Sequence, residues 1–235
     1  SIPTSWPTGT AYAQLETYTD DSYSSCVGTE VYSFTITVDP ASIVPTAGTL
    51  SVALVQPATV PSNWDVYVKG YSTAKLTLSA SSPGSGSSYK NILLSCGSQQ
   101  KSSQSETTFT TNALMETGML TCKAKITNAY GNAASATDKT ITVYDYFSPI
   151  FASLAAYRCT SNGTPSDTGA YISVTASVTI ASVNGKNSLV TLQAQYAPAG
   201  SDTWSTAQAI TNGSATVIGG SIGGTSGYQV RVTAI

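Results

Sequence analysis

The run Leu120-Thr121-Cys122-Lys123-Ala124-Lys125-Ile126 decides the fold class, because apolar and polar residues alternate strictly along it. Successive side chains of a β-strand point to opposite faces, so the run predicts a strand with Leu120, Cys122, Ala124 and Ile126 on a buried face. The same alternation recurs at residues 31–38, 75–79, 173–180 and 228–232. The sequence therefore predicts sheets with one buried and one solvent-facing side.

Short breaks separate these runs and are rich in Gly, Pro, Ser and Asn, at residues 82–86, 128–132, 162–165 and 184–186. Such clusters favour turns because they supply positive φ angles and local side-chain hydrogen bonds. Strands spaced about 8 to 12 residues apart, with turn chemistry between them, are typical of sandwiches. We find no helical periodicity. The expected fold class is all-β, with tandem antiparallel β-sandwich domains.

The composition excludes several function classes. The 235 residues include 10 Lys plus Arg, 12 Asp plus Glu and no His, and only 9% are charged, against about 25% in an average globular protein. Without a basic surplus, nucleic-acid binding is not expected. The absence of His removes the commonest general base and metal ligand. No run approaches the 18 to 20 apolar residues, roughly, that cross a bilayer, so membrane insertion is not expected.

Two proline-containing segments suggest the domain boundaries. Prolines at positions 40 and 45 follow one strand, and Pro149 follows another. We expect residues 1–42 to be the C-terminal remnant of a preceding β domain and 43–146 to be an immunoglobulin-like sandwich. Residues 147–235 are expected to form a fibronectin-III/immunoglobulin-like sandwich that lacks its last strand. Because two strands alone are rarely stable in water, the leading piece either ends a preceding domain or packs on the middle one.

Immunoglobulin-like features appear in the middle and last segments. Residues 118–132 resemble the penultimate strand and turn of an immunoglobulin-like domain, with 133–143 as its final strand. Leu120 stands where such domains usually have Tyr, so the tyrosine corner is absent. Residues 228–234 resemble the equivalent fibronectin-type strand.

An ordered set of motifs carries a more specific resemblance. The set comprises residues 15–18 (LETY), 60–72 (VPSNWDVYVKGYS), 143–149 (VYDYFSP), 157–164 (YRCTSNGT), 169–172 (GAYI) and 182–188 (SVNGKNS). In this order they resemble a family of tail structural proteins of siphophages that infect Gram-positive hosts. That resemblance implies a string of immunoglobulin-like modules near the tail tip, with no catalytic residues. It also implies that the strand ending at Ile235 is followed by one more strand.

The four cysteines leave two readings open. They are Cys26, Cys96, Cys122 and Cys159. Alternation turns Cys96 and Cys122 inward, and on strands of opposite sheets they could form an intersheet disulfide. The alternative is four buried thiols, because phage particles assemble in a reducing cytoplasm. No pair has CxxC spacing, so no zinc site is expected.

Other chemistry-bearing residues point to no catalytic site and no cofactor. The carboxylates are scattered, and turn formation and solvation explain them; Asp145 could help to bind Ca²⁺ at a domain junction, but no DxD cluster supports it. The Gly-rich segment 219–224 is expected to be a flexible turn without a following helix. Trp6, Trp64 and Trp204, with fourteen Tyr, could form a carbohydrate-stacking platform or a protein interface. Core packing is the alternative, and Trp204 is expected in the core.

These observations favour a non-enzymatic structural module of a bacteriophage tail, acting as a spacer or presenting stalk with possible host-surface adhesion. Its expected partners are other virion tail proteins or copies of itself, and a host cell-wall glycan or surface protein. The expected location is the virion. The alternative is a bacterial cell-surface adhesin or carbohydrate-binding module, which would be extracellular. A glycan-cleaving enzyme would require two carboxylates across a cleft.

Overall fold

The computed structural model describes residues 6–223 and 227–235, and this part of the chain is all-β. It forms two compact units. The first contains the described residues up to Val55, together with Thr73–Asn112 and Met119–Ile141. The second contains Gln56–Ser72, Ala113–Gly118 and the described residues from Thr142 onward. The expected boundaries after residues 42 and 146 differ from this division and stay a prediction.

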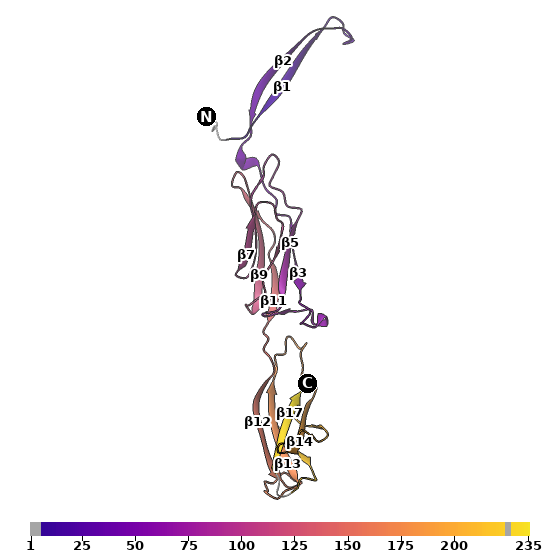
Figure 1. Ribbon diagram of the computed structural model, residues 1–235. Coiled ribbons are helices and arrows are strands. Elements are labelled where there is room, and N and C mark those ends of the chain that lie inside the picture. The colour runs from indigo at the N-terminus through magenta and orange to yellow at the C-terminus, as the bar shows by residue number, and fades with distance from the viewer. Residues whose placement is uncertain (1–5, 224–226) are drawn as a thin grey trace. The chain divides into compact units, whose positions relative to one another are not determined.

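A long hairpin begins the described chain. Strands β1 (Thr8–Tyr18) and β2 (Cys26–Thr37) pair antiparallel with each other and form a sheet of two strands, seen in indigo to violet in Figure 1. The register places Phe34 opposite Ala11 and Leu15 opposite Glu30. No residue of either strand is buried, so the alternation at 31–38 produces a strand but no covered face.

A sandwich of two sheets follows the hairpin. One sheet has the order β4-β11-β9-β6-β7, with β10 also on β9, and the other has the order β3-β5-β8. Their bounds are β3 Thr49–Val55, β4 Tyr67–Val68, β5 Thr73–Ser79, β6 Tyr89–Cys96, β7 Gln99–Ser103, β8 Thr108–Thr110, β9 Gly118–Asn128, β10 Ala133–Ser135 and β11 Lys139–Tyr144. In β9 every second residue from Leu120 to Asn128 is buried, as the alternation predicts.

Two short 3₁₀ helices occur in the loops around this sandwich. Pro40–Ser42 (η1) begins after Asp39, whose side chain accepts a hydrogen bond from the Ala41 backbone N–H at 2.9 Å. Ser62–Trp64 (η2) ends at Asp65, which adopts the left-handed conformation with φ 47°. Asp tolerates this conformation better than most non-glycine residues.

One fully buried amide fixes the turn after β9. Asn128 Nδ2 donates to the carbonyl oxygens of Ile43 (3.0 Å) and Pro83 (3.1 Å). Its Oδ1 accepts from the backbone N–H groups of Tyr130 (3.1 Å) and Asn132 (3.0 Å). The amide thus has partners for both of its donors and for its acceptor. It ties the segment after the hairpin to the turn predicted at 128–132.

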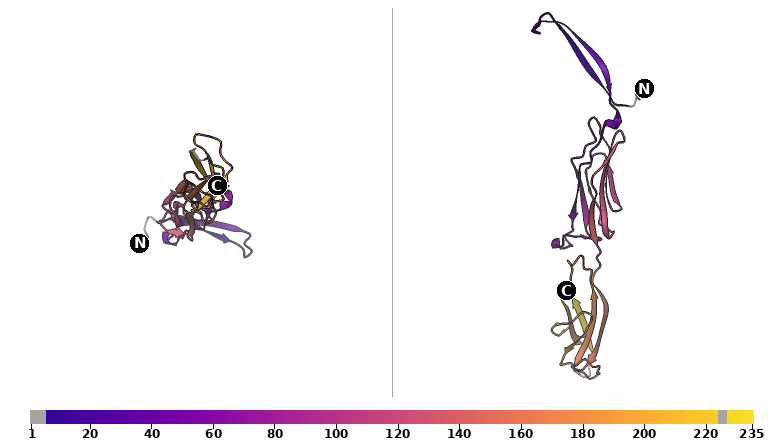
Figure 2. Two further views of the ribbon diagram at one scale, coloured as in Figure 1. Left: turned by 90° about the horizontal axis from the view of Figure 1, so that it is seen from below. Right: turned by 180° about the vertical axis from the view of Figure 1, so that it is seen from behind.

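The second unit contains another pair of sheets. Their orders are β12-β13-β16 and β15-β14-β17, and Figure 2 shows them from behind. Their bounds are β12 Ile150–Cys159, β13 Tyr171–Thr179, β14 Leu192–Pro198, β15 Gln208–Ala209, β16 Ala215–Gly219 and β17 Tyr228–Ala234. The core is formed by the buried residues Ile172, Val174, Ala176, Val178, Leu192, Ala194, Ile210, Ile218 and Ile222. These two sheets and the earlier pair make two largely antiparallel sandwiches in tandem along the chain.

One side of this second core is left open. Leu154 on β12 pairs with Ala176 on β13 and so shares its face, but Leu154 is 54% exposed while Ala176 is fully buried. Among the described strands, β17 pairs only with β14. A further strand beside β17 would cover Leu154. These exposures support the expectation that the last sandwich takes one more strand, which stays a prediction.

Candidate functional site

The cysteine pair lies within one sheet. Cys96 on β6 and Cys122 on β9 are direct register partners, 4.0 Å apart at Cα, and their sulfurs are joined in the structure. The expected link between opposite sheets is therefore wrong in its placement, because β6 and β9 are hydrogen-bonded neighbours. Cys159 is buried but Cys26 is exposed, so four buried thiols are not what the structure has. Cys26 is exposed because it begins β2, which nothing covers.

Several carboxylates have hydrogen-bond or ion-pair partners within the chain. Hydrogen bonds from Ser22 and Ser24 lower the pKa of Asp20 to about 2 at the hairpin turn. Lys101 pairs with Glu106, and Lys123 pairs with Asp138 at 3.6 Å. Among the described residues, no group of three or more His, Cys, Asp and Glu is placed to hold a metal ion. The Asp145 carboxylate, which was considered as a Ca²⁺ ligand, accepts a hydrogen bond from the Lys69 ammonium at 3.1 Å.

Trp204 is not in the core, contrary to expectation. It lies in the segment between β14 and β15, is half-buried, and has the Arg231 guanidinium 4.3 Å from its ring centroid. The residues around it form no strand, so the alternation that would have turned the ring inward is missing. Trp6 is also half-buried, just before β1.

An aromatic site, defined here as Trp64, Tyr71 and Tyr146, gathers side chains from the motifs at 60–72 and 143–149. Tyr71 meets Tyr146 edge-on, with ring centroids 5.4 Å apart and an interplanar angle of 89°. Trp64 and Tyr146 are half-buried and pack on a cluster of small aliphatic side chains. Tyr71 is 41% exposed. In this site Trp64 and Tyr146 are therefore packed against the protein, whereas the ring of Tyr71 is open to solvent.

The backbone around the aromatic site is held by a tight turn. Gly70, at φ +77°, donates its N–H to the Leu114 carbonyl at 2.8 Å. The buried Ser72 hydroxyl accepts from the Val68 N–H at 2.8 Å, and the Leu114 N–H donates to the Ser72 carbonyl at 2.9 Å. Because both flanks are hydrogen-bonded, Tyr71 projects from a fixed loop.

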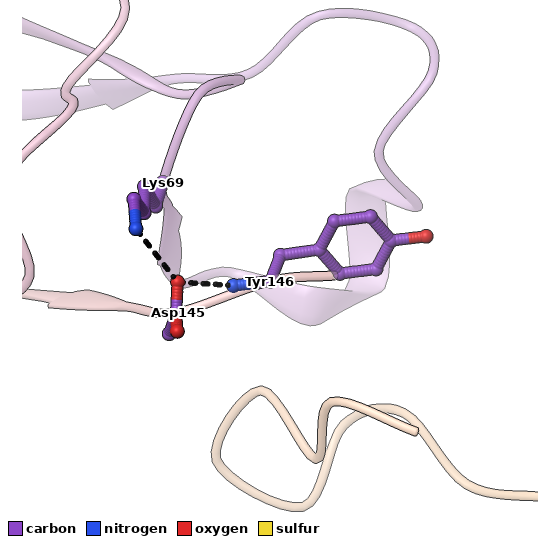
Figure 3. A network of polar contacts seen from close by, with 3 residues as sticks. All are labelled: Lys69, Asp145 and Tyr146. Atoms are coloured by element: carbon purple, nitrogen blue, oxygen red, sulfur yellow. Dashed lines mark hydrogen bonds and ion pairs between the residues drawn. The ribbon is translucent and has the colours of Figure 1, made fainter. Parts of the chain in front are cut away.

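An ion pair positions Tyr146 (Figure 3). Lys69 Nζ donates to Asp145 Oδ1 at 3.1 Å, and the same oxygen accepts from the Tyr146 N–H at 3.1 Å. The Lys69 N–H donates to the Tyr144 carbonyl at 2.9 Å, next to the parallel pairing of β4 with β11. Exposed ion pairs add little stability, so the main effects are orientation and mutual neutralisation of the two charges.

Two hollows flank the tyrosine pair. One, of about 450 Å³, is lined by Thr59, Val60, Pro61, Trp64, Val68, Tyr71, Tyr146 and Asn187. The other, of about 370 Å³, is lined by Lys69, Gly70, Tyr71, Met115, Tyr146, Phe147 and Ser148. Sequence reasoning singled out Trp64 but missed Tyr71 and Tyr146. Their presence in the two aromatic-rich motifs was the available signal.

The hairpin offers a second candidate surface. Direct register partners share a face, so one face of β1 and β2 carries the apolar residues Gly9, Ala11, Ala13, Leu15, Tyr32, Phe34 and Ile36, with Glu30 opposite Leu15 at its end. We name this set the apolar face. Tyr32, Phe34 and Ile36 are 56%, 53% and 48% exposed. The hairpin is acidic, because it contains Glu16, Asp20, Asp21 and Glu30, and no Lys or Arg precedes Lys69 in the sequence.

A family model described as "Siphovirus protein of unknown function (DUF859)" matches residues 1–222. The chain belongs to this siphovirus family. The resemblance to siphophage proteins inferred from the sequence is thereby confirmed. The search of curated proteins found no match for this siphovirus protein. Among its described residues, none of the helices has the length and apolarity to span a membrane.

Solved structures similar to the siphovirus protein include multidomain chains. The FN1–FN3 domains of chicken CNTN1 are 12% identical with a TM-score of 0.30, covering 95% of this chain and 71% of that one. Domains A168–A170 from titin are 14% identical with a TM-score of 0.36, covering 87% and 64%. Chitinase ChiA74 from Bacillus thuringiensis is 13% identical with a TM-score of 0.28, covering 82% and 29%. No activity follows from these likenesses.

Proposed function

We propose that this siphovirus protein is a non-enzymatic structural module of the phage tail, at its tip or in a fibre, serving as a spacer or presenting stalk. The observation that carries the proposal is the apolar face of the hairpin in a chain of sandwich modules. Two strands alone bury too little surface to be stable in water. Another polypeptide surface is therefore needed to cover Tyr32, Phe34 and Ile36, which are all exposed.

The partner surface can be described from the hairpin. It must present apolar side chains to the apolar face and tolerate or complement the acidic residues Glu16, Asp20, Asp21 and Glu30. Contiguous exposed apolar patches mark protein interaction sites. Another virion tail protein, or a neighbouring copy of this chain, meets these needs within a tail.

Two substitutions on adjacent residues test the proposal. Phe34→Glu puts a charge on the apolar face, and Thr35→Glu puts the same charge on the opposite face of β2. Both side chains are exposed, so neither change should unfold the chain. In a phage that carries Phe34→Glu, we expect the protein to be lost from purified virions by quantitative mass spectrometry, while Thr35→Glu retains it. Equal incorporation of both variants would contradict the proposed role of the apolar face.

Weak adhesion to the host surface is the second part of the proposal, and the aromatic site favours it. Exposed Tyr and Trp are common anchors for both glycans and proteins. A cell-surface adhesin or carbohydrate-binding module would use the same feature, so the aromatic site does not separate the two functions. Membership of the siphovirus family supports a phage protein over that alternative. Detection of the protein in virions, and not on uninfected bacteria, tests this choice.

A further inference from the structure

We propose that the aromatic site is a binding site for a neutral saccharide, an inference that rests on the proposed adhesion and names the ligand class of that site. The site consists of Trp64, Tyr71 and Tyr146 with the two hollows beside them. The proposal depends on the shape of the hollows, their polar rim, their charge and their rigidity.

The shape suits a sugar ring. The perpendicular arrangement of Tyr71 and Tyr146 forms a corner, and the larger hollow beside it also reaches Trp64. Its volume of about 450 Å³ lies within the range of roughly 300 to 1,000 Å³ found for small-molecule sites. A pyranose has a face of C–H groups that packs against an aromatic ring, while its hydroxyls point to the rim.

The rim supplies hydrogen-bonding groups of the right kind. Thr59 and Asn187 line the larger hollow together with the two tyrosines. Hydroxyls both donate and accept, and an amide offers a donor and an acceptor. Sugar hydroxyls also do both, so such a rim matches them without requiring a charge.

The charge of the site selects a neutral ligand. Among the described residues that line the hollows, Lys69 is the only charged one, and its ammonium pairs with Asp145 at 3.1 Å. An anionic ligand such as a phosphate would have to displace the Asp145 carboxylate from Lys69. A neutral saccharide leaves that pair intact, and with it the hydrogen bond that positions Tyr146.

The site is also preorganised. The Gly70 turn is hydrogen-bonded to Leu114, and Tyr146 is held through Asp145 and the pairing of β11 with β4. Binding to groups that are already ordered costs less conformational entropy than binding to mobile side chains. This lower entropic cost explains how three aromatic rings in an open hollow can be sufficient to bind a saccharide.

Tryptophan fluorescence tests the proposal with the full chain. Trp6→Phe and Trp204→Phe together leave Trp64 as the only tryptophan of three. Chitotetraose, maltotetraose and cellotetraose serve as neutral probes, and tetragalacturonate and inorganic phosphate as anionic ones. We expect a saturable change in Trp64 emission with at least one neutral probe and none with the anions. Failure of all three neutral probes, or saturation by an anionic probe alone, overturns the proposal.

Matched variants separate stacking from folding. Tyr71→Ala removes the open ring and should weaken binding at least 10-fold, whereas Tyr71→Phe keeps the ring and most of the affinity. Tyr12→Ala removes a tyrosine that is 71% exposed on the hairpin and should change nothing. Equal binding by Tyr71→Ala and the parent overturns the proposal. Incorporation into virions is measured without saccharide, so a failure here is distinguishable from a failure of the structural role.

Discussion

Cys96 and Cys122 lie directly opposite each other on neighbouring strands, which brings their side chains together. Their direct pairing across β6 and β9 leads us to propose a disulfide in the isolated protein. Mass spectrometry of a non-reduced digest should find the two peptides linked. In the folded chain, iodoacetamide should label the exposed Cys26 rapidly and Cys159 slowly, because burial raises the pKa of the Cys159 thiol. Labelling of all four thiols after unfolding without reductant would contradict the bridge.

The buried Asn128 should be the most costly polar residue to remove from the first sandwich. Asn128→Ala removes the donor to the Pro83 carbonyl and the acceptor of the Tyr130 and Asn132 N–H groups, while the Ile43 carbonyl keeps Asn132 Nδ2 as a donor. Unsatisfied buried groups cost about 1 to 3 kcal/mol each, so we expect a loss of about 3 kcal/mol in the free energy of unfolding. Urea denaturation measures it. Asn162→Ala, at an exposed turn, is the control and should cost less than about 1 kcal/mol; equal losses would contradict the role of Asn128.

The hairpin turn should depend on pH through Asp20. Hydrogen bonds from Ser22 and Ser24 lower its pKa from 3.8 to about 2. A lowered folded pKa means that the carboxylate stabilises the turn fully above pH 3.8, and that this contribution is lost as the pH falls through about 2. NMR titration of the Asp20 carboxyl carbon should show this midpoint, with the amide signals of Ser22 and Ser24 moving together with it. A midpoint at 3.8 or above would show that the turn is not hydrogen-bonded in this way.

At the scale of elements, exposure on β12 leads to a stability prediction. Leu154 is 54% exposed, so Leu154→Ser should change the free energy of unfolding of this chain by less than about 0.5 kcal/mol. Val174→Ser on the neighbouring β13 is the control. Val174 is fully buried, and the change should cost at least about 2 kcal/mol. A large loss from Leu154→Ser would mean that the face of β12 is already covered, which would remove the support for a further strand beside β17.

The strands also show which features of the fold can be predicted from the sequence and which cannot. Alternation predicted the strands and their inward sides correctly in β9 and β13, because a buried face requires it. It could not predict which strands are neighbours, so the cysteine pair was assigned to opposite sheets. Alternation also could not predict that β2, which has the same pattern, has no buried residue on either face. The aromatic site was missed because Tyr71 and Tyr146 are far apart in sequence and meet through the pairing of β4 with β11.

At the scale of the whole molecule, tandem sandwiches in a siphovirus family protein suit a mechanical role. Each sandwich has its own buried core, and the open surfaces include the apolar face of the hairpin, the face of β12 at Leu154 and the aromatic site. We propose that the apolar face of the hairpin assembles with a polypeptide of the phage tail and that the aromatic site contacts a neutral saccharide. Few charges and no His agree with a chain whose proposed work is packing and contact rather than catalysis.

Immunogold electron microscopy of purified virions, with antibodies raised against this chain, tests the central proposal most directly. Label on the tail, concentrated at its tip or along a fibre, is the result that we predict. Parallel grids of virions from a phage that carries Phe34→Glu should show little label, and those from Thr35→Glu should be labelled like the parent. Particles with intact tails and no gold above background, while the protein is abundant in the infected cells, would contradict the assignment of this chain to the tail.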